Sequence, residues 1–143
     1  MTTVKTSPLY SEVLKELNYS WGCFYFFDGF VVSEINEGVN FSWEFAKHVI
    51  LEVNEFYKSN SSDLVYISNR INGYNVKPVD WFKFTACAFK LKGYGIVVDS
   101  HIKSRNAKFE SLFVPMKIKV FNDLLDCIQW AAHLNEKTRQ LTD

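Results

Sequence analysis

The stretch GCFYFFDGFVVSEI, residues 22–35, holds the strongest indication of fold in the chain. It places Asp28-Gly29 between two apolar and aromatic runs of the kind that form β-strands. Asp-Gly at this position favours a two-residue type I′ turn, because both central residues of that turn need a positive φ. The sequence therefore predicts a β-hairpin that turns at Asp28 and Gly29.

The residues before this hairpin are less clear. Alternation from Leu17 to Phe27 predicts one long strand that leads into the turn, with every second side chain on the same face. Residues 9–17 are compatible with either a helix or an extended segment, so the structure of residues 1–17 is left unassigned. Residues 1–8 are expected to fray.

Helix-like and strand-like segments alternate after the hairpin. Apolar residues at helical spacing predict a first helix over 42–57, with Ser42 at its N-cap. A second helix is predicted from Asp80 to 89, and a third within 104–113. A last helix is expected from 122 onward, and its tail from 136 to fray. Its predicted inward stripe is Leu124, Leu125, Ile128, Ala131 and Ala132.

Three short apolar segments between these helices predict strands. LVYI at 64–67 and YGIVV at 94–98 suit central strands that are covered on both faces. MKIKVF at 116–121 alternates apolar residues with lysine, which is typical of a strand near the edge of a sheet. The order predicts an α/β fold with a mixed, mostly parallel sheet that is opened by a β-hairpin, and with about four helices.

Length and composition predict a single globular domain whose core spans about residues 9–136. The chain has 143 residues, 48% of them hydrophobic, so a core can form without disulfides. Lys plus Arg and Asp plus Glu both total 16, so no net charge attracts nucleic acid. Since the sequence shows neither an apolar signal region nor a membrane-spanning stretch, we expect a cytoplasmic protein that is not integral to a membrane.

The sequence contains no complete motif for catalysis, metal binding or cofactor binding. The three cysteines, Cys23, Cys87 and Cys127, lack C-x-x-C spacing, and the histidines lack zinc-site spacing. Neither a glycine-rich phosphate loop nor a G-x-S-x-G nucleophile turn occurs. We therefore expect no enzymatic activity, no metal and no cofactor.

Polar residues follow the predicted central strand, at the place where open α/β sheets bind ligands. They are Ser68, Asn69, Arg70 and Asn72. The Arg70 guanidinium can hold a carboxylate or phosphate of a ligand in a bidentate fork. Alternatively, Asn72-Gly73 forms a simple turn and Arg70 pairs with an acid such as Glu34 or Glu37, which is the favoured interpretation because loops prefer these residue types.

The order of elements also resembles a known family. The residues that support the resemblance are FVVSEINEGV at 30–39, LVYISNRI at 64–71, KGYGIVV at 92–98 and FESLFVPMKIKVF at 109–121. From about Gly22 to Leu134 the layout resembles the STAS fold of bacterial anti-sigma-factor antagonists. It is most similar to the SpoIIAA-like branch, which is distantly related to lipid-binding SEC14 domains.

This resemblance implies a regulatory module that binds a protein partner through the second helix, including Asp80 and Trp81, and the loops before it. The family is switched by phosphorylation of a Ser or Thr at the start of that helix. VKPVDWF at 76–82 has no such hydroxyl, so control by phosphorylation is not expected. Asp80 either mimics a permanent charge or is an ordinary helix cap, and the cap is the favoured interpretation.

The SEC14 likeness implies an alternative function, the binding of a small apolar or lipid-like ligand between helices and sheet. Its motivation is the aromatic set Trp81, Phe82, Phe84 and Phe89, although such rings are more often part of a core. The sequence leaves the identity of any partner open, and it is compatible with a homodimer.

Overall fold

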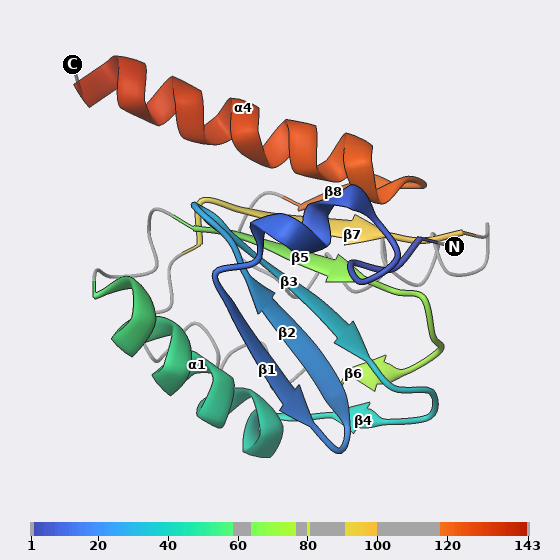
Figure 1. Ribbon diagram of the computed structural model, residues 1–143. Helices are drawn as coiled ribbons and strands as arrows, with labels where there is room; N and C mark the ends of the chain where they lie inside the picture. Colours follow the sequence, from blue (N-terminus) through green and yellow to red (C-terminus); the bar gives the residue numbers. More distant parts are fainter. Residues whose placement is uncertain (1, 59–63, 77–79, 81–90, 100–117, 143) are drawn as a thin grey trace.

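A six-stranded mixed sheet in the order β1-β2-β3-β5-β7-β8 forms the centre of the fold (Figure 1). The computed structural model describes residues 2–58, 64–76, 80, 91–99 and 118–142. The first three strands pair antiparallel, and β3, β5, β7 and β8 pair parallel. The predicted α/β class with a mixed, mostly parallel sheet is therefore confirmed. The strands are β1 (Lys15–Tyr19), β2 (Gly22–Phe26), β3 (Phe30–Ile35), β5 (Val65–Asn69), β7 (Gly93–Val97) and β8 (Ile118–Phe121).

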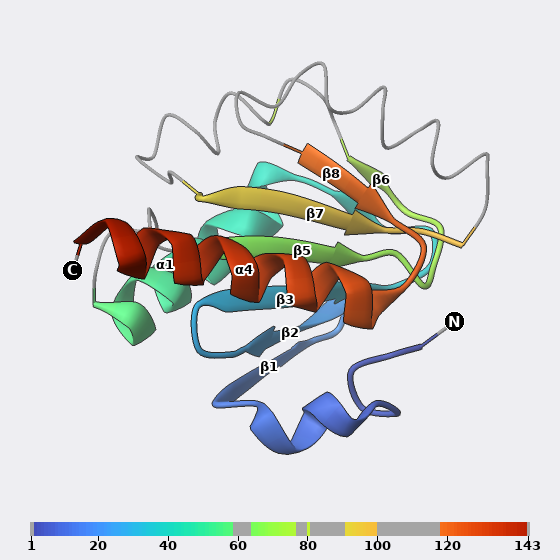
Figure 2. The ribbon, with the colours of Figure 1, turned by 90° about the horizontal axis from the view of Figure 1, so that it is seen from above.

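Two helices cover opposite faces of this sheet, α1 (Trp43–Tyr57) and α4 (Leu124–Thr142) (Figures 1 and 2). The structure describes these two α-helices, so the expected number of about four is not supported by the described residues. The other two predicted helices, over 81–89 and 104–113, lie outside them. The core on the α1 face includes Phe24, Phe26, Val31, Ile35, Val49, Val53 and Ile96. The core on the α4 face includes Tyr25, Phe27, Val32, Ile67, Val97, Leu124 and Cys127.

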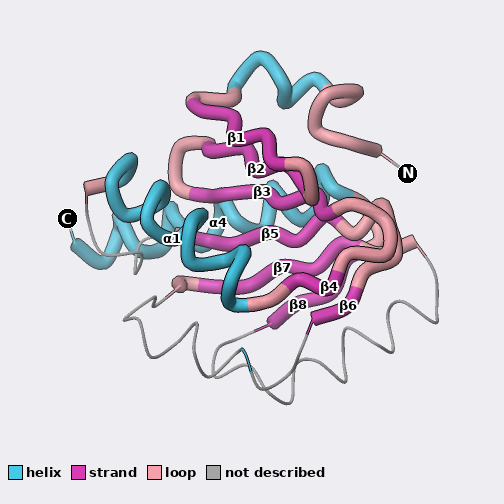
Figure 3. Tube along the Cα trace, turned by 90° about the horizontal axis from the view of Figure 1, so that it is seen from below, coloured by secondary structure: helices cyan, strands magenta, loops and turns pink. Residues whose placement is uncertain are grey.

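A second, two-stranded parallel sheet lies near the carboxyl ends of β3 and β5. It pairs β4 (Asn40–Phe41) with β6 (Asn75–Val76), and neither strand was expected from the sequence (Figure 3). A short 3-10 helix, η1 (Pro8–Glu12), precedes β1. The sheet therefore has added structure at both the carboxyl ends of its strands and its first edge.

The single long strand expected over 17–27 is wrong, because the chain reverses at Ser20 and Trp21 and forms β1 and β2. Leu17 pairs with Phe24, and directly opposed residues share a face, so the reversal places Leu17 and Phe24 on the α1 side. The Trp21 ring stacks on Tyr19 and on Phe45 of α1, with centroids 4.8 and 4.7 Å apart. The two turn positions lack the Asn-Gly or Asp-Gly pair that marks a two-residue hairpin, and Ser20 with the following Gly22 is a weaker turn signal than Asp28-Gly29.

The hairpin at Asp28 and Gly29 is confirmed, but its predicted type I′ geometry is wrong. Gly29 has a φ of +85°, whereas Asp28 does not adopt a positive φ. The Phe27 N–H donates to the Phe30 carbonyl at 2.9 Å, and the two rings stack with centroids 4.6 Å apart. Stacking of the flanking rings therefore closes a turn that needs only one left-handed residue.

Both chain ends are more ordered than the sequence suggests. Residues 2–7 do not fray, because Val4 is fully buried and Ser7 caps η1. The helix α4 continues to Thr142, although its tail was expected to fray. Its expected inward stripe is also shifted: Leu125 is 41% exposed, whereas Cys127 is fully buried.

Glycine in β7 explains why α4 turns Cys127 inward. A Cβ atom at Gly95 would lie 2.5 Å from the Cys127 Sγ and 3.2 Å from the Trp130 ring. A Cβ at Gly93 would lie 3.0 Å from the same ring. Because Gly93 and Gly95 have no side chains, β7 leaves space for the Cys127 sulfur and the Trp130 indole of α4.

We expect Gly95→Ala to lower the free energy of unfolding by about 1–3 kcal/mol, as overpacking does in a close-packed core. Adding Cys127→Ala removes the clashing sulfur, so the double variant should be more stable than the sum of the single changes predicts. Urea unfolding of all four proteins measures this coupling. Additive effects would show that the Gly95–Cys127 contact does not limit the packing of α4.

Candidate functional site

The predicted site residues at the end of β5 are nearly buried and face two different sides of the sheet. Ser68, Asn69 and Arg70 are 1%, 1% and 8% exposed. Ser68 and Arg70 contact residues of the α1 face, whereas Asn69 contacts Glu34 and the N-terminal segment on the α4 face. The structure therefore divides these residues between two polar groups.

A network of hydroxyl groups surrounds Arg70 on the α1 face. Its Nε and Nη2 atoms donate to Ser68 Oγ and Tyr94 Oη, both at 3.2 Å, and its guanidinium lies 5.1 Å from the centroid of the Tyr74 ring. Ser68 Oγ and Tyr74 Oη are 2.6 Å apart. Tyr66 donates to Ser33 Oγ at 2.7 Å, and its ring meets Tyr94 edge to face. We call this set the hydroxyl cluster; its members are Ser33, Tyr66, Ser68, Arg70, Tyr74 and Tyr94.

The acids that were expected to pair with Arg70 make other contacts. Glu34 binds the Val4 amide on the α4 face, and Glu37 accepts the Gly73 N–H at 2.8 Å. The described contacts therefore do not support a pairing of Arg70 with Glu34 or Glu37. Arg70 points its polar atoms into the hydroxyl cluster, whose tyrosines were not recognised as site residues. The period-two pattern of β5 places Tyr66, Ser68 and Arg70 together and was the available signal.

A buried carboxylate forms the second polar group, on the α4 face. Glu34 is 7% exposed, and its Oε2 accepts from the Val4 N–H at 2.9 Å and from Asn69 Nδ2 at 2.8 Å. The same amide nitrogen donates to the Thr2 carbonyl at 3.0 Å. Burial raises the pKa of Glu34, although these hydrogen bonds and the charge of Lys5 act in the opposite direction. The amide oxygen of Asn69, Oδ1, is buried without a hydrogen-bond partner.

Two loops at the carboxyl end of the sheet are fastened to each other. Gly38 donates to the Gly73 carbonyl at 2.7 Å, and Asn75 donates to the Val39 carbonyl at 3.0 Å. Asn72, a predicted site residue, donates through Nδ2 to the Ile35 carbonyl at 3.1 Å. We call loops 36–40 and 71–76 the loop platform. Its exposed residues are Asn36, Glu37, Gly38, Asn40, Gly73 and Asn75.

Asp80 lies against the start of α1. Its carboxylate is 5% exposed and accepts the Trp43 N–H at 3.0 Å, so it satisfies a free amide at the positive end of the helix. Ser42, the predicted cap, makes no side-chain hydrogen bond to α1. The helix that Asp80 was expected to cap lies outside the described residues, as does Trp81. Asp80 thus joins the segment after the loop platform to α1.

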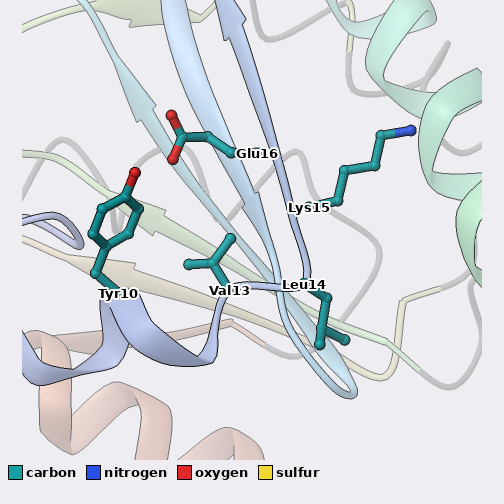
Figure 4. Close-up of a pocket in the computed structure, with 5 residues that line it drawn as sticks. All are labelled: Tyr10, Val13, Leu14, Lys15 and Glu16. Carbon is teal, nitrogen blue, oxygen red and sulfur yellow. The ribbon is translucent and has the colours of Figure 1, made fainter.

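An open hollow lies elsewhere, between η1 and β1 (Figure 4). It measures about 290 Å³ and is lined by Tyr10, Val13, Leu14, Lys15 and Glu16. The Lys15 side chain points away from it toward α1, where it pairs with Glu52 at 3.0 Å. The hollow includes none of the predicted site residues, and it is smaller and more open than the clefts that usually bury small molecules.

Within the described part of the chain, no three His, Cys, Asp or Glu side chains are grouped so that they could hold a metal ion. None of the described helices combines the length and the apolar character needed to cross a membrane. Comparison of the chain with family models, with curated proteins and with solved structures finds no match.

We expect Asp80→Ala to lower the free energy of unfolding by about 1–2 kcal/mol, the usual effect of losing a helix cap. The matched change, Ser42→Ala, should have an effect below about 0.5 kcal/mol because Ser42 makes no cap bond. Urea unfolding compares the two variants. A larger loss for Ser42→Ala than for Asp80→Ala would contradict the assignment of Asp80 as the cap.

The raised pKa of Glu34 predicts a dependence of stability on pH. The folded chain binds this proton more tightly than the unfolded chain, so the associated stability is present at low pH and is lost as pH rises through the folded-state pKa. Relative to the wild type, Glu34→Gln should therefore gain stability as pH rises from about 4 to 7. Urea unfolding across this range tests the trend, with Glu55→Gln as an exposed control. A constant difference between Glu34→Gln and wild type would contradict it.

Proposed function

We propose that this protein is a non-enzymatic, STAS-like regulatory module that binds a protein partner through the loop platform and the segment that follows it. Control by phosphorylation is not part of the proposal, because residues 76–82 contain no hydroxyl side chain. The proposal includes a SpoIIAA-like arrangement with about four helices, and it includes a cytoplasmic location for the protein. It rests on the resemblance in element order, on the position of the loop platform and on the hydrogen bonds that join its two loops.

The observation that supports the proposal most strongly is the fastening of two exposed loops beyond the carboxyl ends of β3 and β5. Loops usually vary in conformation, yet here a parallel strand pair and the Gly38–Gly73 hydrogen bond hold them together. A surface that is already ordered loses less conformational freedom when a partner docks. The platform therefore suits recognition of a macromolecule by its exposed amides and backbone groups.

The buried site residues support this surface from below. Tyr74 belongs to the platform, and its hydroxyl is 2.6 Å from Ser68 Oγ, while its ring lies under the Arg70 guanidinium. Asn72 ties the same loop to β3 through the Ile35 carbonyl. In this proposal Ser68, Arg70 and Asn72 position the loop, and the exposed residues contact the partner.

The alternative function, binding of a small apolar or lipid-like ligand, depends on Trp81, Phe82, Phe84 and Phe89. These residues lie outside the described part of the chain. The described contacts therefore bear only on the protein-partner proposal, which stays the leading one.

A photo-crosslinking amino acid at Asn75, in cells that naturally make the protein, tests the proposal. We expect a discrete protein adduct from Asn75 and none from the matched exposed position Asn54 on α1. Adding Ser68→Ala should reduce the Asn75 adduct about tenfold, which corresponds to about 1.4 kcal/mol of binding free energy. Equal labelling from both positions, or no adduct from Asn75, would contradict a partner site on the loop platform.

A further inference from the structure

The segment 2–7, which we call the N-terminal strap, inserts one side chain into the α4 face. Val4 is fully buried, with an exposed fraction of 0%, and belongs to the same core as Tyr25, Ile67 and Leu124. Its neighbours Thr2, Lys5 and Thr6 are exposed. The strap beyond η1 is therefore held by one aliphatic anchor, by the polar atoms beside it, and by an exposed ion pair in which Lys5 Nζ lies 3.5 Å from Glu16 Oε2.

Those polar atoms recognise main-chain groups of the strap. Glu34 accepts the Val4 N–H, and Asn69 donates to the Thr2 carbonyl. Neither hydrogen bond involves the side chain of Thr2 or Val4. Glu34 and Asn69 therefore recognise only main-chain atoms of the strap, and the apolar anchor is the one side chain that is recognised. A different segment with an aliphatic residue at the same position can make the same hydrogen bonds.

The strap also fills this site imperfectly. Asn69 is only 1% exposed, and its Oδ1 atom is buried without a hydrogen-bond partner. Burial raises the pKa of Glu34, whereas the Val4 N–H and the charge of Lys5, both from the strap, act to lower it. The charged and titratable groups that face Glu34 are Lys5 of the strap, and Tyr25 and Cys23 of β2. The unmet hydrogen bond of Asn69 Oδ1 is therefore a cost that the bound strap does not offset.

We infer that Glu34 and Asn69 form a binding site for a short polypeptide segment with a valine-like anchor, and that residues 2–4 are its exchangeable occupant. The partner segment supplies an N–H to Glu34, a carbonyl to Asn69 Nδ2 and an aliphatic side chain to the Val4 position. A segment that also offers a donor to Asn69 Oδ1 binds more tightly than the strap does. This site contains no residue of the loop platform, so it stands independently of the proposed function.

The test uses the full chain with Val4→Asp, which removes the anchor and opens the site. A fluorescent peptide with the sequence of residues 1–7 is titrated against this variant and against the wild type, and binding is followed by fluorescence anisotropy. We expect at least tenfold tighter binding to Val4→Asp than to the wild type, whose site is occupied. A peptide with aspartate in place of its valine should not bind, and adding Glu34→Ala to the protein should weaken binding at least fivefold.

Release of the strap is measured separately, by the rate at which trypsin cleaves after Lys5. Circular dichroism and thermal unfolding verify the fold, and Val4→Gly replaces Val4→Asp if the latter does not fold. A folded variant that is cleaved faster at Lys5 but does not bind the peptide would overturn the inference. The inference would also be overturned if neither Val4→Asp nor Val4→Gly is cleaved faster after Lys5 than the wild type. Crosslinking from Asn75 is expected to be unchanged in either variant, so failure here is distinguishable from failure of the proposed function.

Discussion

The structure depends on the position of β5 between two parallel neighbours. Since β3 and β7 take its backbone hydrogen bonds and both faces are covered, every β5 side chain must fit one of two cores. Its polar end is subject to the same constraint, because alternate residues point to opposite faces. Ser68 and Asn69 are both 1% exposed, so each needs polar partners on its own side.

The polar partners of Ser68 and of Asn69 differ between the two faces of the sheet. On each face these partners also hold a segment that lies beyond the sheet. On the α1 face the hydroxyl cluster holds Tyr74 and thereby one loop of the platform. On the α4 face Glu34 and Asn69 hold the backbone of the N-terminal strap. The polar residues at the carboxyl end of β5 thus organise two separate surfaces from the interior of the molecule. In the binding roles proposed above, their burial restricts them to positioning other groups.

Arg70 shows most clearly how strand alternation decides which side chains meet. A bidentate fork or a surface ion pair is expected if Arg70 belongs to one exposed loop with Asn69 and Asn72. Continuing the strand alternation by one residue would have separated Asn69 from Ser68 and Arg70. The reversal at Ser20 and Trp21 was less accessible, because Ser20 is only a weak turn signal and stacking of Trp21 on Phe45 of α1 stabilises the reversal.

By itself the sequence determined the elements whose signals are local: the Asp28-Gly29 hairpin, the helix that is α1, and the strands β5, β7 and β8. These signals are local because hydrophobic period and turn chemistry depend on neighbours in the chain. Only the tertiary structure decided that Asp80 caps α1, that Gly95 admits Cys127, and that Val4 docks on Glu34. Each of these contacts joins residues at least 30 positions apart, and the free energy of such pairs depends on packing that no single segment encodes.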